Sequence, residues 1–234
     1  VANGTVSAYA WAPLGDITAD QFRALAAIQR EFDAGVRLTN RQNLVFRDLT
    51  DDRLPALFER LDAIGMAAAG AELSRDVVAC PGADTCNLAV TQSRGLAKAI
   101  GDRLEEEGLA EVGGVRINIS GCTNSCGQHH ASDIGFFGAE RRANGRSAPG
   151  YQMLLGGYVG EEQIFFGDKA LRLPAKNAAE GAVRVIRRFA SERVAGETLA
   201  SWQARAPRPW PEVVAVYLDA GRGLAAVHAL GLLH

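Results

Sequence analysis

The sequence lacks the features that would place it in several specialised classes of protein. No apolar run approaches the roughly 20 residues needed to cross a bilayer, and the longest, Ala67–Ala71, is followed at once by Glu72. Neither sign of charge is in excess, because 25 Lys and Arg face 27 Asp and Glu, for a formal net charge of −2. There is no low-complexity tract and no repeat at a period of about 20–50 residues. These absences argue against a membrane-spanning, nucleic-acid-binding or repeat protein.

What remains is typical of a folded globular protein. Hydrophobic residues make up 47% of the 234 residues and charged residues 22%, enough to bury the core of one large domain or two small ones. The first residues carry neither the basic n-region nor the apolar h-region of a signal peptide. The chain begins at Val1 rather than Met. We therefore expect a processed product or a piece of a longer protein.

The first part of the chain has the element order β-α-β-β-α of a ferredoxin-like unit. Thr18 and Gln21 have the spacing of a capping box, which predicts a helix start, and the apolar residues that follow keep a helical period up to Gly35. The expected elements are strands at 5–11, 36–38 and 43–47, a polar turn at 39–42, and helices from Thr18 to Gly35 and from Asp51 or Asp52 to Gly65.

The rest of the chain alternates short apolar runs with helical segments, which predicts a mixed α/β lobe and an α+β fold class overall. We expect strands at 76–79, 114–120, 133–138, 151–157 and 163–166, helices at 88–108 and 175–194, and a hairpin loop at 140–150. After a cluster of prolines, Pro211 can open a short helix to about Ala220. The expected division is a ferredoxin-like half domain at 1–70, a lobe at 71–195 and a helical tail at 196–234.

Four cysteines lie in the middle of the chain and none elsewhere. Cys80 and Cys86 form a C-x5-C pair, and Cys122 and Cys126 form a C-x3-C pair. Each pair begins where an expected strand meets a turn rich in glycine or proline, so rigid strand ends can direct several thiolates to one place. Nothing else indicates secretion, so we expect a reducing compartment, the cytoplasm.

Four thiolates can hold zinc or an iron–sulfur cluster. Structural zinc sites favour pairs spaced C-x2–4-C, and the first gap here is wider than that, which favours a cluster over zinc. Two local disulfides or four buried free thiols are the alternatives without a metal.

The cysteine segments resemble the sirohaem-containing sulfite and nitrite reductases. The similarity lies in Cys80-Pro-Gly-Ala-Asp-Thr-Cys86-Asn-Leu-Ala, in Ile119-Ser-Gly-Cys122-Thr-Asn-Ser-Cys126-Gly-Gln-His-His, in Asp133-Ile-Gly-Phe136, and in the segment from Val36 to Leu44. It extends over about Gly4–Arg193. Thr123 stands where the family often has proline.

The resemblance implies two cofactors and a reaction. The four cysteines would ligate a [4Fe–4S] cluster, and Cys126 would also bridge to the iron of a sirohaem. Electrons from a donor such as ferredoxin or a flavoprotein would reduce sulfite to sulfide or nitrite to ammonium, in a six-electron reaction. The sequence does not decide between the two anions, and no catalytic residue is assigned.

Further residues become candidates for binding the cofactors. Arg37 and Arg41 flank a turn that could hold sirohaem carboxylates, and Thr39 and Asn43 belong to the same turn; a solvated loop is the alternative. Backbone N–H groups at Asn124 could hydrogen-bond cluster sulfides, or Asn124 could simply be a turn residue.

His129 and His130 directly follow the second cysteine pair. One of them could donate a proton or lie beside the haem. The interpretation we favour is an ordinary pair of polar residues at a strand edge.

Full-length members of the resembled family contain two homologous halves, and this chain matches the second, cysteine-bearing half. A homologous half or a second copy is therefore an expected partner. The alternatives to a reductase are a non-catalytic [4Fe–4S] electron-transfer module and a zinc-stabilised structural domain.

Overall fold

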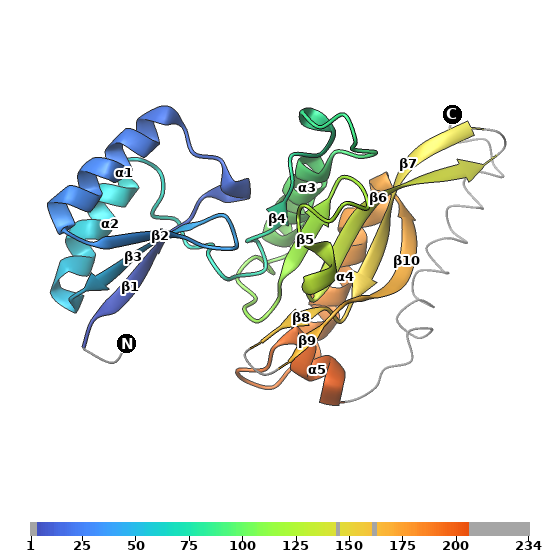
Figure 1. Cartoon of the computed structure of the whole chain (residues 1–234). Helices are drawn as coiled ribbons and strands as arrows, with labels where there is room; N and C mark the ends of the chain where they lie inside the picture. Colours follow the sequence, from blue (N-terminus) through green and yellow to red (C-terminus); the bar gives the residue numbers. More distant parts are fainter. Residues whose placement is uncertain (1–3, 144–145, 161–162, 206–234) are drawn as a thin grey trace.

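The computed structural model describes residues 4–143, 146–160 and 163–205. Buried apolar side chains there form two separate clusters, one in the first unit (residues 4–62) together with Met66, and a larger one in the second lobe (residues 78–205) together with Val77. The two parts lie side by side and are joined by residues 63–77 (Figure 1). The mixed α+β architecture expected from the sequence is confirmed.

The first unit is a three-stranded antiparallel sheet packed against two helices. Strands β1 (Val6–Ala10), β3 (Leu44–Leu49) and β2 (Gly35–Leu38) are hydrogen-bonded in that order. Helices α1 (Ala19–Phe32) and α2 (Leu54–Asp62) bury Leu25, Ile28 and Leu57 among others. The capping box is confirmed, since Thr18 Oγ1 accepts the N–H of Gln21 at 3.2 Å and Gln21 Oε1 accepts that of Thr18 at 2.9 Å.

The ends of these helices differ from the prediction. Helix α1 ends at Phe32 because Asp33 adopts a left-handed conformation with φ of 44°, which Asp tolerates better than most residues. Gly35, expected to end that helix, begins β2. Residues Asp51–Arg53 form a short 3₁₀ turn, so α2 starts only at Leu54.

The second lobe is built on a five-stranded mixed sheet in the order β10-β7-β6-β5-β4. Strands β4 (Val78–Ala79), β5 (Ile117–Ser120) and β6 (Ile134–Ala143) are parallel, whereas β7 (Arg146–Leu155) and β10 (Asp168–Pro174) run antiparallel to their neighbours. Strands β8 (Tyr158–Val159) and β9 (Ile164–Phe165) form a separate hairpin.

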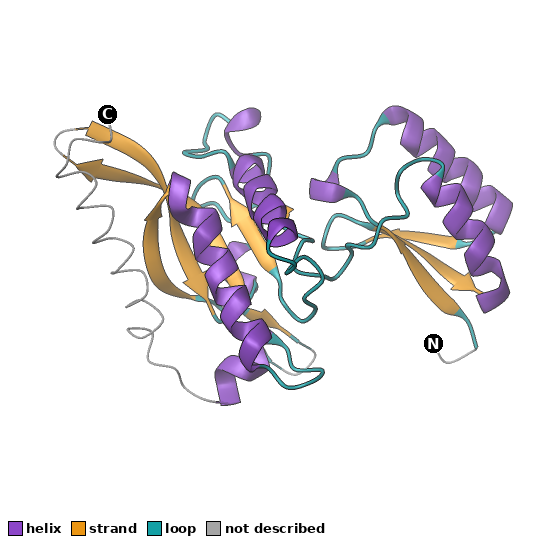
Figure 2. Ribbon diagram, turned by 180° about the vertical axis from the view of Figure 1, so that it is seen from behind, coloured by secondary structure: helices purple, strands orange, loops and turns teal. Residues whose placement is uncertain are grey.

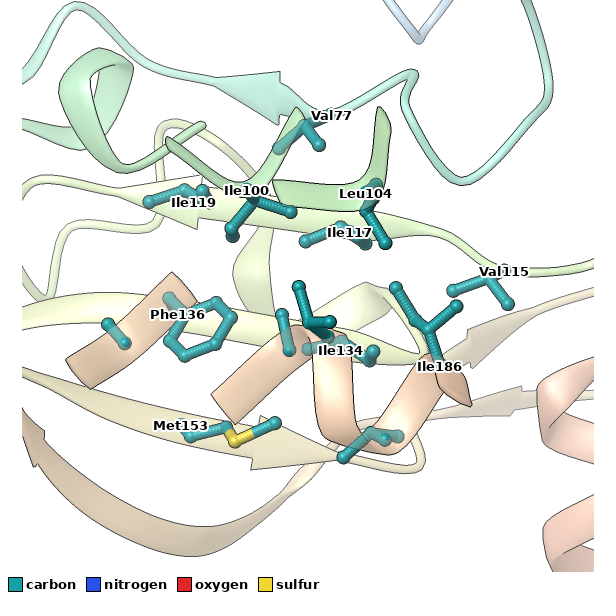
Figure 3. Close-up of a cluster of buried hydrophobic side chains, with 14 of the residues drawn as sticks. Val77, Ile100, Leu104, Val115, Ile117, Ile119, Ile134, Phe136, Met153 and Ile186 are labelled. Carbon is teal, nitrogen blue, oxygen red and sulfur yellow. The ribbon is translucent and has the colours of Figure 1, made fainter. Parts of the chain in front are cut away.

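Helices α3 (Ser93–Glu106) and α4 (Ala175–Glu192) lie against one face of this sheet (Figure 2). Ile100 and Leu104 of α3 and Ile186 of α4 meet apolar side chains of β5 and β6, among them Ile117 and Ile134 (Figure 3). A short helix, α5 (Leu199–Arg205), follows α4 in the described part of the chain. No helix in the described ranges is both long and apolar enough to span a membrane.

Two predictions for this lobe are wrong, and two strands, β8 and β10, were not expected. The segment 140–150 is not a loop as a whole, because β6 extends to Ala143 and β7 begins at Arg146, with Glu140 opposite Pro149. Pro149 lies beyond Gly150, where the pairing of β7 with β10 ends, and a proline is tolerated at such an edge. Helix α3 starts at Ser93 rather than 88. The helix proposed from Pro211 lies outside the described residues.

Candidate functional site

The four cysteines follow the carboxyl ends of two neighbouring parallel strands. Ala79 of β4 is opposite Ile119 of β5, Cys80 directly follows the first strand, and Cys122 lies two residues beyond the second. Parallel strands end at the same edge of a sheet, so their following loops adjoin. This topology brings the C-x5-C and C-x3-C loops together, as the sequence predicted.

Cys80 is held by hydrogen bonds from both loops. Its N–H donates to the carbonyl O of Ile119 at 3.1 Å, and its Sγ accepts the N–H of Gly121 at 3.2 Å. Ser93 Oγ donates to the carbonyl O of Cys80 at 2.6 Å and lies 3.4 Å from Sγ. An N–H aimed at a cysteine sulfur that ligates a cluster raises the reduction potential of that cluster.

Gly121 joins the two cysteine loops. Its carbonyl O accepts the N–H groups of Val90 and Thr91 at 2.8 and 3.2 Å, so the far end of the first loop docks on the start of the second. A Cβ on Gly121 would lie 2.9 Å from the Cα of Gly82 and from the carbonyl O of Thr91. The loops therefore approach at a distance that only glycine allows here.

Gly138 of β6 lies beneath this junction, and its replacement by alanine is expected to destabilise the lobe. The added Cβ would lie well inside van der Waals distance of the carbonyl O of Gly121 and of Thr91 Oγ1. We expect Gly138→Ala to lower the free energy of unfolding, measured in urea, by about 1–3 kcal/mol. Gly101→Ala in α3 meets open space and should raise it by ~0.5–1 kcal/mol. Equal stability of Gly138→Ala and the unaltered chain would contradict this packing.

The thiols themselves fit a cluster better than they fit the metal-free alternatives. All four are free, so the local disulfides considered above are not formed. Cys86 and Cys126 are exposed and Cys80 and Cys122 half-buried, so the set is not a group of core thiols. No three Cys, His, Asp or Glu side chains in the described ranges are placed to hold one metal ion. The C-x5-C gap is wider than the pairs that structural zinc sites favour, so the donor set favours a cluster over zinc.

The turn expected to hold sirohaem carboxylates is engaged elsewhere, apart from Arg37. Arg37 is exposed. Arg41, only 6% exposed, pairs with the carboxylate of Asp76 at 3.1 Å and donates to the carbonyl O of that residue at 2.7 Å. Asn43 also donates to the Asp76 carboxylate, at 2.9 Å, and Thr39 Oγ1 accepts the N–H groups of Arg41 and Asn43. Arg41 and Asn43 therefore hold the first unit to Asp76, two residues before β4, and Thr39 holds their turn together.

This turn also adjoins the cysteine site. Gln42 Nε2 donates to the carbonyl O of Ala79 at 3.3 Å, directly before Cys80. The structure thus brings the turn and the first cysteine loop together. Asn124 lies exposed between Cys122 and Cys126, as expected for a turn residue.

Sequence reasoning missed Asp76 and Ser120, and it favoured a surface position for His129. Asp76 is 3% exposed, and burial raises the pKa of its carboxyl while Arg41 opposes that shift. His129 is fully buried, and burial followed by repulsion from His130 lowers its pKa to about 4. The polar spacing of this segment carried no signal of burial, so the strand-edge interpretation of His129 is wrong.

A cavity of about 560 Å³ lies at the opposite ends of β5 and β6, away from the cysteines. Arg41, Glu72, Arg116 and Asp133 are among its lining residues. Burial raises the pKa of Asp133 to about 6, although its Oδ2 accepts the N–H of Arg116 at 2.8 Å. Arg116 directly precedes β5 and Asp133 directly precedes β6. The bond between them therefore occupies the carboxylate and joins the starts of the two strands.

Comparisons with known proteins match both parts of the chain to one group. The nitrite/sulfite reductase ferredoxin-like half domain matches residues 2–64, and the nitrite and sulphite reductase 4Fe-4S domain matches residues 70–164. The ferredoxin–nitrite reductase of Synechococcus elongatus is 36% identical over 77% of this chain and 35% of its own length. Sulfite reductase [ferredoxin] 1 of Mycolicibacterium paratuberculosis is 31% identical over 88% of this chain and 38% of its own length.

Solved structures agree with these matches. The Mycobacterium tuberculosis NirA protein superposes with a TM-score of 0.70 at 30% identity, over 86% of this chain and 38% of that one. Dissimilatory sulfite reductase I has a TM-score of 0.68 at 11% identity, over 91% of this chain and 68% of that one, and shows the fold alone. The chain therefore spans 35% and 38% of the length of the two relatives named above.

Proposed function

Because the chain belongs to the sirohaem-dependent nitrite and sulfite reductase family, we propose that it is the cluster-bearing half of such a reductase. The reaction proposed is the six-electron reduction of nitrite to ammonium or of sulfite to sulfide. One observation carries this proposal: four free cysteines follow adjacent parallel strands, in two loops joined through Gly121.

We assign the [4Fe–4S] ligands to Cys80, Cys86, Cys122 and Cys126. Cys126, which is exposed, would also face the sirohaem, and Arg37, which is exposed and bonds only to the carbonyl O of the adjacent Val36 among the described residues, would pair with one of its carboxylates. When bound, the cluster and the haem supply the electron path and the place where the anion is reduced. The chain itself sets the spacing of the thiolates, aims the N–H of Gly121 at one of them and leaves one side of the site open.

The same proposal includes the domain division and the partners. Residues 1–70 form the ferredoxin-like half domain, residues 71–195 the cluster lobe and residues 196–234 a tail. Ferredoxin is named as the donor of both curated relatives described above, and we propose the same donor here. A homologous half or a second copy would complete the enzyme, and the reducing chemistry suits the cytoplasm.

An absorption spectrum of the anaerobically purified chain, with iron, sulfide and zinc measured on the same sample, tests the proposal. We expect about four iron and four sulfide per chain, the composition of a cubane held by four cysteines. A Soret-type band in addition would show that this half binds sirohaem by itself. Iron and sulfide without that band, even after a sister half is added, would favour the electron-transfer module. Zinc in place of iron would overturn the proposal.

A further inference from the structure

A buried histidine stands behind the second cysteine loop. His129 Nδ1 lies 2.8 Å from Ser120 Oγ, and both residues are almost fully buried. The same Oγ accepts the N–H of Gly127 at 3.1 Å. Ser120 precedes Cys122 by two residues and Gly127 directly follows Cys126, so one hydroxyl group holds both ends of the loop that carries these cysteines.

The surroundings of this hydroxyl leave little freedom. Asn118 Nδ2 donates to the carbonyl O of Gly127 at 2.9 Å, and a Cβ on Gly127 would overlap the carbonyl group of Ile119. The ring of His129 packs against Phe137, with ring centroids 4.9 Å apart. The loop thus packs directly on β5, and the ring of His129 packs against the buried side of this contact.

The hydrogen-bond pattern indicates how the ring acts. With its pKa near 4, the imidazole is neutral at ordinary pH, so one ring nitrogen carries the proton. Ser120 Oγ has two acceptor lone pairs and one hydrogen, so it accepts the N–H of Gly127 and can in addition either donate to Nδ1 or accept a proton from it. In both tautomers the ring is hydrogen-bonded to Ser120 through Nδ1. Nε2 is buried and has no hydrogen-bond partner among the described residues.

That orphaned nitrogen is a penalty that an apolar ring would avoid. Leaving a buried polar atom without a partner costs about 1–3 kcal/mol, and phenylalanine would fill the same space without that cost. The feature that phenylalanine cannot supply is the bond between Nδ1 and Ser120.

We propose that His129 is a positioning residue that orients the Ser120 hydroxyl and thereby fixes the loop bearing Cys122 and Cys126. The inference rests on the proposed function, because its consequence is a better-held [4Fe–4S] cluster. His129 touches neither substrate nor cluster ligand in this arrangement. It acts through Ser120 and Gly127, as residues that hydrogen-bond to the segment carrying a metal ligand do.

Two substitutions at His129 separate positioning from mere packing. His129→Phe keeps a ring of similar size but loses the bond to Ser120, whereas His129→Asn is smaller but keeps an acceptor near the position of Nδ1. If the residue positions the loop, the Phe variant should release iron to a chelator about 10–100-fold faster than the unaltered chain, with the Asn variant close to normal. If the residue only packs, the order should reverse.

Serine variants provide the matched comparison. Ser120→Ala should release iron as fast as His129→Phe, and the double variant should be no faster than either, because both remove the same contact. Ser74→Ala is the control, since Ser74 is also fully buried and its hydroxyl bonds to the carbonyl O of Leu109, away from the cysteine loop and from His129. Additive effects of His129→Phe and Ser120→Ala would overturn the proposal.

A readout without the cluster distinguishes this inference from the proposed function. In the iron-free chain, amide hydrogen exchange at Gly127 should be about tenfold or more faster in His129→Phe than in His129→Asn, since a bond worth about 1.4 kcal/mol shifts an equilibrium tenfold. A chain that binds no iron yet shows this difference would sink the proposed function and keep the positioning role. Equal Gly127 exchange in the two variants would refute the positioning role.

Discussion

Replacing Asp76 by asparagine is expected to lower the free energy of unfolding by about 3–5 kcal/mol, the usual consequence of leaving a buried charge without its partner. The Asp76 carboxylate accepts hydrogen bonds from Asn43 and from Trp11 Nε1, and it pairs with Arg41. Without that charge, the Arg41 guanidinium stays 6% exposed with only its bonds to carbonyl groups and to Glu72. Urea unfolding followed by circular dichroism measures the loss.

Glu72→Gln is the matched control for this prediction. Glu72 pairs with the same guanidinium at 3.2 Å, but its side chain is 41% exposed, and exposed ion pairs contribute about 0–1 kcal/mol. The double variant Arg41→Met with Asp76→Asn should be more stable than the sum of the single changes predicts, because it removes both buried charges. These contacts of Arg41 and Asn43 with Asp76 form the joint between the first unit and the lobe. A loss of stability of similar size in Glu72→Gln and Asp76→Asn would show that the strength of this joint does not depend on burial.

The joint also marks the limit of what the sequence could predict. The polar turn 39–42 indicates a place where basic residues matter, and the resemblance assigns Arg41 and the following Asn43 to sirohaem. In the structure both side chains bind Asp76, which lies 35 residues beyond Arg41. No local pattern reports a partner at that separation, because it depends on how the first unit docks on the lobe. Their role toward sirohaem stays a prediction beside this structural one.

Local signals, in contrast, were sufficient where the physics is local. The capping box at Thr18 and Gln21 predicted the start of α1, and the turns after Ala79 and Ser120 predicted that the cysteine loops adjoin. The segment 140–150 misled because glycine and proline usually mark a loop. There the register of β6 with β7 tolerates Pro149, since its missing N–H falls beyond the pairing with β10.

Removing a single cysteine is expected to have the largest effect on function. In Cys80→Ser, iron and sulfide should fall to near zero, because a [4Fe–4S] cluster depends on all four thiolates and Cys80 is the one that receives the N–H of Gly121. Serine is close in size to cysteine, so the iron-free chain should unfold at almost the same urea concentration. Iron, sulfide and unfolding are measured on one anaerobic preparation.

Cys126→Ser should differ from Cys80→Ser where sirohaem is present. Since Cys126 is exposed and is the proposed shared ligand, its loss should change the haem absorption band and the magnetic coupling seen by electron paramagnetic resonance. Thr123→Ser is the control, because Thr123 is exposed in the same loop and has no proposed ligand role. Full iron and sulfide in Cys80→Ser would show that the cluster is not held by these four residues. A haem spectrum unchanged in Cys126→Ser would show that Cys126 is not shared with the sirohaem, while the assignment of the other three cysteines would stand. The two variants therefore test two separate assignments. Cys80→Ser tests whether these cysteines ligate the cluster, and Cys126→Ser tests whether one of them is shared with the haem.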